Sequence, residues 1–88
     1  MADPLPPASF ANFLVGLRTQ GLMQVGAIPH PHLGRREANP PYARYTIELL
    51  RILRDKTEGR RSQDETDLLD GSIRELEHLL EHPPGQPE

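Results

Sequence analysis

Histidine is the residue type in this sequence best suited to metal binding, and its four copies form two pairs. His30 and His32 flank a proline, whereas His78 and His82 are four residues apart in a segment with helical spacing. Imidazoles at i and i+4 can chelate Zn²⁺, and a second pair could complete a four-ligand shell. No sequence feature brings the two pairs together, and histidines near the end of a helix also suit the helix dipole. We therefore expect no bound metal; the alternative hypothesis of a metal-binding protein depends on His78 and His82.

Arginine makes up all but one of the ten basic residues and could contact nucleic-acid phosphates. The formal net charge is −3, however, and Glu48 and Asp55 interrupt the basic side of one predicted helix. We expect these charges to be structural, with an RNA- or ribosome-associated accessory protein as the alternative. The residues that such a protein would use are Arg35, Arg36, Arg51, Arg54, Arg60 and Arg61.

Nucleophiles in a catalytic context are missing from the sequence. It contains no cysteine, and none of Ser9, Ser62 and Ser72 lies in a Gly-x-Ser-x-Gly nucleophile elbow. No glycine run resembles a phosphate-binding loop, and there is no His-Glu-x-x-His motif. We therefore expect neither an enzyme nor a cofactor.

Prolines divide the chain into the segments that must position all these side chains. A proline inside a helix costs about 3 kcal/mol, and the ten prolines leave two free windows, residues 8–28 and 42–82. We predict a single helical domain over residues 9–82 that includes a Pro/Gly connector over 26–39. The Pro-rich ends are predicted to be flexible tails, residues 1–8 and 83–88.

The apolar runs of the sequence are too short to span a membrane. The longest uninterrupted apolar runs are three residues, such as Phe13 to Val15, whereas a membrane-spanning helix needs about 20. The first residues contain no basic segment followed by an apolar stretch, so we expect no signal peptide. A cytoplasmic location is the expectation.

A first helix is predicted over residues 10–25. Ser9 is a suitable N-cap, and Gly26 stands where a glycine commonly ends a helix. Ile28 and Leu33 could dock the connector that follows. The predicted core-facing stripe of this helix comprises Phe10, Phe13, Leu14, Leu17, Gly21 and Val25.

Two further helices are predicted over residues 40–57 and 63–82. Asn39 caps the first of them, with proline at the first helical position, where its missing N–H is harmless. Ser62 and Glu65 match a capping box at the start of the other. We expect these two helices to form an antiparallel hairpin, and the fold class to be all-α with three helices and no strand.

The helix over 40–57 carries more apolar surface than one neighbour can cover. Its apolar side chains span about 220°, whereas packing against one helix needs only about 100°. Either the helix lies between the other two within one chain, or part of this arc is a seam between copies. We favour self-association, as a dimer, with an unidentified protein partner also open. The interface residues predicted for the seam are Tyr42, Tyr45, Leu49 and Ile52.

Charge is distributed unevenly along the chain. Residues 35–61 carry eight positive and four negative side chains, and residues 62–88 carry one positive and eight negative. An antiparallel hairpin would lay the acidic start of its second helix beside the basic end of its first. Acidic residues in the first turn of a helix also complement its dipole.

Two short motifs are more specific than the hydrophobic spacing: Gly26-Ala-Ile-Pro29-His-Pro31 and Lys56-Thr57-Glu58-Gly59. Together with the apolar spacing before and between them, they make residues 10–80 resemble an uncharacterised bacterial family, domain of unknown function 1844. The resemblance implies a small helical cytosolic protein with no established activity, so it transfers no catalytic residue. Arg60, where similar proteins often have asparagine, and Gly71, in a stretch usually rich in helix formers, depart from the pattern. The overall prediction is a small non-enzymatic helical protein of unknown role, acting as a self-associating protein-interaction module.

Overall fold

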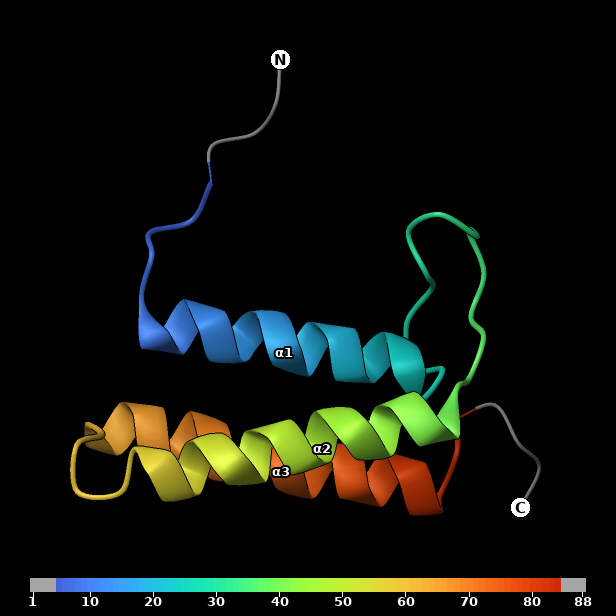
Figure 1. Cartoon of the computed structure of the whole chain (residues 1–88). Helices are drawn as coiled ribbons and strands as arrows, with labels where there is room; N and C mark the ends of the chain where they lie inside the picture. The colour runs from blue at the N-terminus through green and yellow to red at the C-terminus, as the bar shows by residue number, and fades with distance from the viewer. Residues whose placement is uncertain (1–4, 85–88) are drawn as a thin grey trace.

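The computed structural model describes residues 5–84, which form three helices and no strand. The helices are α1 (Phe10–Gln24), α2 (Pro40–Lys56) and α3 (Gln63–Glu81) (Figure 1). All three predicted helices are confirmed, and each ends one residue before its predicted end. Residues 1–4 and 85–88 of the predicted tails lie outside the described residues.

Each helix begins directly after the residue that the sequence marks as its N-cap. The Ser9 side chain accepts a hydrogen bond from the backbone N–H of Asn12, and Asn39 accepts from that of Tyr42. Ser62 and Glu65 form the complete capping box, in which each side chain accepts from the other residue's backbone N–H. These bonds satisfy N–H groups that have no partner within their own helix.

The end of α1 is a Schellman motif built on Gly26. This residue has φ +82°, in the left-handed region that favours glycine. Its N–H donates to the Met23 carbonyl at 3.1 Å, and the Ala27 N–H donates to the Leu22 carbonyl at 2.8 Å. The predicted stop signal therefore acts by turning the chain out of α1 into the connector.

The α2–α3 hairpin is antiparallel, as predicted, and its charges meet across the seam. Arg54 pairs with Asp70, and Arg51, one turn earlier on α2, pairs with Glu77, two turns further along α3. The partner on α3 thus lies later in the sequence as the arginine on α2 lies earlier, which is the order that antiparallel packing requires. The basic α2 and the acidic α3 thus hold the hairpin in register.

The remaining helix, α1, lies against both members of the hairpin (Figure 1). Thr46 Oγ1 of α2 donates to Gln24 Oε1 at 2.5 Å, and Arg18 donates to the Glu75 carboxylate of α3 at 2.6 Å. Helix α1 runs antiparallel to α2 and in the same direction as α3 (Figure 1).

The core is a cluster of aliphatic side chains at the centre of these three contacts. Gly21 of α1 is also buried, against Leu76. The fully packed members of the cluster are Leu14, Ile47, Leu50, Leu69, Ile73 and Leu76.

Phe13 departs from the predicted core-facing stripe of α1, because its side chain is 51% exposed. The buried residues Leu14 and Gly21 define the centre of the stripe. Successive helical residues differ by about 100° in direction, so Phe13 points well to one side of that centre.

The connector between α1 and α2 folds back on itself. The His30 N–H donates to the Arg35 carbonyl, and the Gly34 N–H donates to the His30 carbonyl, both at 2.9 Å. Ile28 is half-buried, but Leu33 is 47% exposed, so Leu33 does not dock the connector as expected. This internal turn places Leu33 at the rim of the loop.

Candidate interaction face on α1 and α2

One edge of α2 is left uncovered by both neighbouring helices. The buried residues of α2 are Ala43, Thr46, Ile47 and Leu50. Tyr42, Tyr45 and Ile52 are 57%, 59% and 51% exposed, and Leu49 is half-buried. Packing between α1 and α3 therefore accounts for part of the apolar arc, and it leaves three of the four residues predicted for a seam at the surface.

The two tyrosines of this edge hold each other in place. Their ring centroids are 6.3 Å apart and their planes are inclined at 84°, the edge-to-face geometry that aromatic pairs favour. With Pro41 they line a shallow hollow of about 370 Å³. The edge thus presents a preformed aromatic surface.

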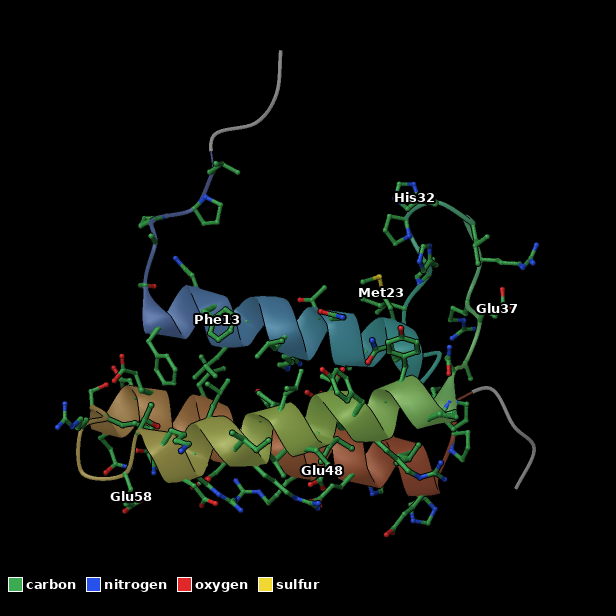
Figure 2. All side chains as sticks on the ribbon, viewed as in Figure 1. Phe13, Met23, His32, Glu37, Glu48 and Glu58 are labelled. Atoms are coloured by element: carbon green, nitrogen blue, oxygen red, sulfur yellow. The ribbon has the colours of Figure 1, made fainter. Side chains whose placement is uncertain are left out.

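The neighbouring edge of α1 continues the uncovered surface. Gln24 bonds to Thr46 of α2, and Gln20, Gly16 and Phe13 precede it at spacings of four, four and three residues. Residues at these spacings share one side of a helix. Phe13 and Met23 lie towards opposite ends of α1 (Figure 2).

On α2, Tyr42 and Leu49 stand four residues before and three residues after Thr46. The Gln24–Thr46 bond therefore brings the two edges together as one surface, here named the α1–α2 face. It contains no Asp, Glu, Lys, Arg or His. Its residues are Phe13, Gly16, Gln20, Met23, Tyr42, Tyr45, Leu49 and Ile52.

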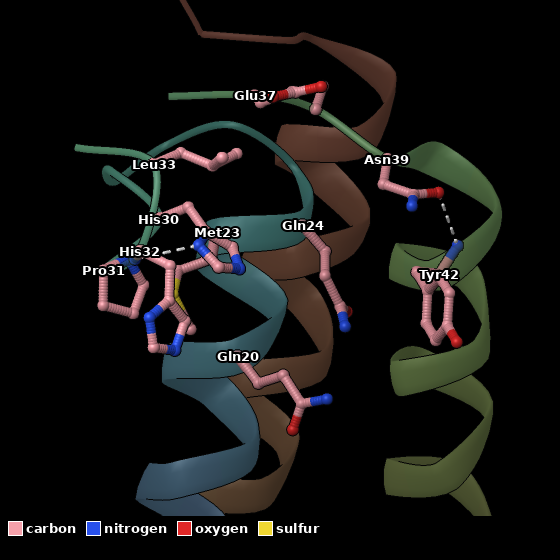
Figure 3. Close-up of a pocket in the computed structure, with 11 residues that line it drawn as sticks. Gln20, Met23, Gln24, His30, Pro31, His32, Leu33, Glu37, Asn39 and Tyr42 are labelled. Atoms are coloured by element: carbon pink, nitrogen blue, oxygen red, sulfur yellow. Dashed lines mark hydrogen bonds between the residues drawn. The ribbon is translucent and has the colours of Figure 1, made fainter. Parts of the chain in front are cut away.

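A groove of about 590 Å³ lies at the end of this face where the connector joins α1 to α2 (Figure 3). The side chains of Gln20 and Gln24 point from α1 towards α2, and Tyr42 stands on the α2 side. Met23 and Leu33 supply further apolar lining. The groove combines carbon surface with amide groups that can donate and accept hydrogen bonds. Its lining also includes His30, His32 and Glu37 of the connector.

Sequence reasoning did not single out Met23 or this groove. Its shape depends on the internal turn of the connector, which no helical periodicity encodes. Phe13 gave a signal, since it lies at the border of the apolar arc of α1, but the border position alone does not say whether a neighbour covers it.

Four of the six arginines considered for nucleic acid are engaged within the chain. Arg35 pairs with Glu37, and Arg54 with Asp70, each at 3.5 Å. The remaining two, Arg36 and Arg60, are exposed and form no ion pair within residues 5–84.

Two carboxylates flank Arg51. Hydrogen bonds to Glu48 and then to Glu77 raise the pKa of the Arg51 guanidinium above its ordinary value. The side chain therefore stays charged, and both carboxylates occupy its donors.

Arg61 is the most enclosed of the six, with a side chain that is 8% exposed. It donates to the Arg54 carbonyl at 2.6 Å, to Thr57 Oγ1 at 2.9 Å and to Thr66 Oγ1 at 3.1 Å. These partners belong to the end of α2 and the start of α3. Arg61 therefore links the end of α2 to the start of α3 across the hairpin turn.

The two histidine pairs lie on different elements. The rings of His78 and His82, near the end of α3, are exposed with centroids 4.8 Å apart. In the connector, His30 Nδ1 accepts from the His32 N–H at 3.1 Å. Among the residues described, no three or more histidine and acidic side chains are grouped so that they could hold a metal ion.

These features define a class: a small all-α protein of three helices with one uncovered apolar face. The chain belongs to the family described as Domain of unknown function (DUF1844), whose model matches residues 7–81. The resemblance seen in the two short motifs is thereby confirmed. No curated protein and no solved structure matches the chain. None of its described helices is long and apolar enough to cross a membrane.

Proposed function

We propose that this protein is a non-enzymatic, cytoplasmic protein-interaction module that self-associates, with a dimer favoured, through the α1–α2 face. The observation that carries the proposal is the exposure of Tyr42, Tyr45 and Ile52 along one edge of α2. Large apolar side chains gathered on one face of a small protein mark an interaction site. A second copy presents the same face, so a closed two-fold pair can cover both.

The positions of the serines support a role without catalysis. Ser9 and Ser62 cap α1 and α3, and Ser72 is buried in the bundle. None of them faces the groove. The α1–α2 face instead has the composition of an interface core, where aromatic residues and methionine are common and charged residues are rare.

The test is to compare the mass in solution of the wild type with that of face variants, by light scattering and sedimentation at micromolar concentration. Leu49→Asp and Ile52→Asp are expected to shift the protein to monomer, because each would bury an unpaired carboxylate in the seam. Circular dichroism establishes that these variants retain their helices.

Arg44→Glu is the matched control, since Arg44 is exposed on the polar side of the same helix. It is expected to leave the assembly intact. A compact monomer formed by the wild type throughout the micromolar range would overturn the proposal.

A further inference from the structure

We propose that the groove at the connector and the adjoining tyrosine hollow bind a proline-rich segment of a partner protein in the polyproline II conformation. Tyr42 lines both the groove and the hollow, so the two adjoin at this ring. The inference goes beyond self-association, because one copy alone presents both of them.

Three side chains of the groove have an acceptor atom occupied by the fold, which leaves their N–H groups for a ligand. Gln24 Oε1 accepts from a hydroxyl of α2, and Asn39 Oδ1 accepts from a backbone N–H of α2. His30 Nδ1 accepts from a backbone N–H of the connector, so the proton of the neutral imidazole is on Nε2. The amide nitrogen of Asn39 turns into the space between α1 and α2, and Nε2 of His30 turns towards Gln24 (Figure 3).

A ligand that suits these donors supplies acceptors and brings few donors of its own. Each proline residue has a carbonyl oxygen and no N–H. In polyproline II the backbone makes no internal hydrogen bonds, so its carbonyl oxygens stay free to accept. Glu37, the acidic residue of the lining, pairs with Arg35, so the groove requires no charge on the ligand.

The tyrosine hollow suits the rings of such a ligand. Tyr42 and Tyr45 hold each other edge to face and are 57% and 59% exposed, and Pro41 completes the lining. Proline-rich segments dock in grooves lined by aromatic rings, and their preformed helix loses little entropy on binding. Polyproline II has three residues per turn, so prolines three positions apart lie on one edge of the ligand. Acceptor-rich backbone and apolar rings together match the donors and the tyrosines.

The probe is fluorescently labelled decaproline, and the measurement is its anisotropy on titration with the full chain. A labelled glycine–serine peptide of the same length is the control, and decaproline should bind at least about tenfold more tightly. In NMR spectra of the nitrogen-labelled protein, decaproline should shift the side-chain amide signals of Gln24 and Asn39. The amide of Asn12, which bonds to the Pro7 carbonyl before α1, should not shift.

Two substitutions remove one feature of the site each. Asn39→Asp keeps the N-cap acceptor, because aspartate caps a helix as well as asparagine, but it lacks the N–H and should weaken decaproline binding by about tenfold. Tyr45→Ala removes an aromatic anchor and should weaken it by about tenfold as well. Ile52→Ala is the control, because Ile52 is exposed on the same helix and lines neither the groove nor the hollow. Circular dichroism establishes that the variants retain their helices.

Leu49→Asp separates this inference from the proposed function, since Leu49 belongs to the predicted seam but lines neither the groove nor the hollow. This variant should bind decaproline as the wild type does. A monomeric wild type that binds decaproline overturns self-association alone. Equal binding of decaproline and the glycine–serine peptide overturns this inference alone, as does decaproline binding that neither Asn39→Asp nor Tyr45→Ala weakens.

Discussion

Gly21 of α1 lies so close to Leu76 of α3 that a Cβ on residue 21 would stand 2.6 Å from Leu76 Cδ1. Leu76 is fully buried in the core, so its side chain has little room to move aside. Hydrogen at this position is what allows α1 to approach α3. The Arg18–Glu75 ion pair joins the same two helices.

Overpacking a core usually costs about 1–3 kcal/mol, and alanine gains roughly 1 kcal/mol over glycine in a helix interior. Gly21→Ala is therefore expected to destabilise the protein by up to about 2 kcal/mol. The measurement is chemical denaturation followed by circular dichroism.

Gly71→Ala is the matched control for this substitution. It is also a glycine within a helix, yet a Cβ there would meet no atom within 4 Å. It should raise the free energy of unfolding by up to about 1 kcal/mol. If both substitutions stabilise the protein equally, the close approach of α1 to α3 is not a constraint.

The sequence was sufficient to predict the helices, because their limits are local. Capping side chains, a proline at the first position of α2 and Gly26 each act within a few residues of where they stand. The spacing places Gly21 in the apolar stripe of α1, but it does not explain why this residue is a glycine. That reason is a contact with a residue 55 positions away, which depends on how α1 lies across α3.

The buried hydroxyl of Ser72 allows a second test of how the helices pack. Its hydroxyl is buried and has no hydrogen-bond partner. A buried unsatisfied polar group costs about 1–3 kcal/mol, and alanine is also the better helix former. Ser72→Ala should raise the melting temperature by roughly 4–8 °C per kcal/mol gained. A lower melting temperature would show that the hydroxyl is bonded in solution.

The bond between Thr46 and Gln24 links α1 to α2 beside the groove, beneath the candidate face. Thr46→Val keeps the shape of the side chain and removes the donor, so it is expected to cost about 0.5–1.5 kcal/mol. A double-mutant cycle with Gln24→Leu should give a coupling energy of about 1 kcal/mol. Additive effects of the two substitutions would mean that the bond does not contribute to stability.

The part of the candidate face that lies on α2 could be predicted from the sequence, whereas the part on α1 could not. The seam residues on α2 follow from an apolar arc too wide for one neighbour, which is a property of one helix. The contribution of α1 does not follow, since Phe13 could have been covered or not depending on the angle at which α1 crosses the hairpin. The groove also needs the connector's internal turn, which is set by Gly34 at φ +67° and by backbone bonds.

Arg61 and its neighbour Arg60 provide a sharp comparison of a structural and a solvent-exposed arginine. Arg61→Ala is expected to destabilise the protein by about 2–3 kcal/mol, because a charged group that makes several buried hydrogen bonds is lost and the carbonyl at the end of α2 loses its donor. Arg61→Lys should recover only part of the loss, since an ammonium group cannot reproduce the planar fork of the guanidinium.

Arg60→Ala, at an exposed position, should change the free energy of unfolding by less than about 0.5 kcal/mol. Urea denaturation of the four proteins, each with the same slope, measures the difference. Equal effects of the two alanine substitutions on the free energy of unfolding would show that Arg61 does not stabilise the hairpin turn. A large loss confined to Arg61 would instead support the assignment of this side chain to the turn, where it is not free to meet a nucleic acid.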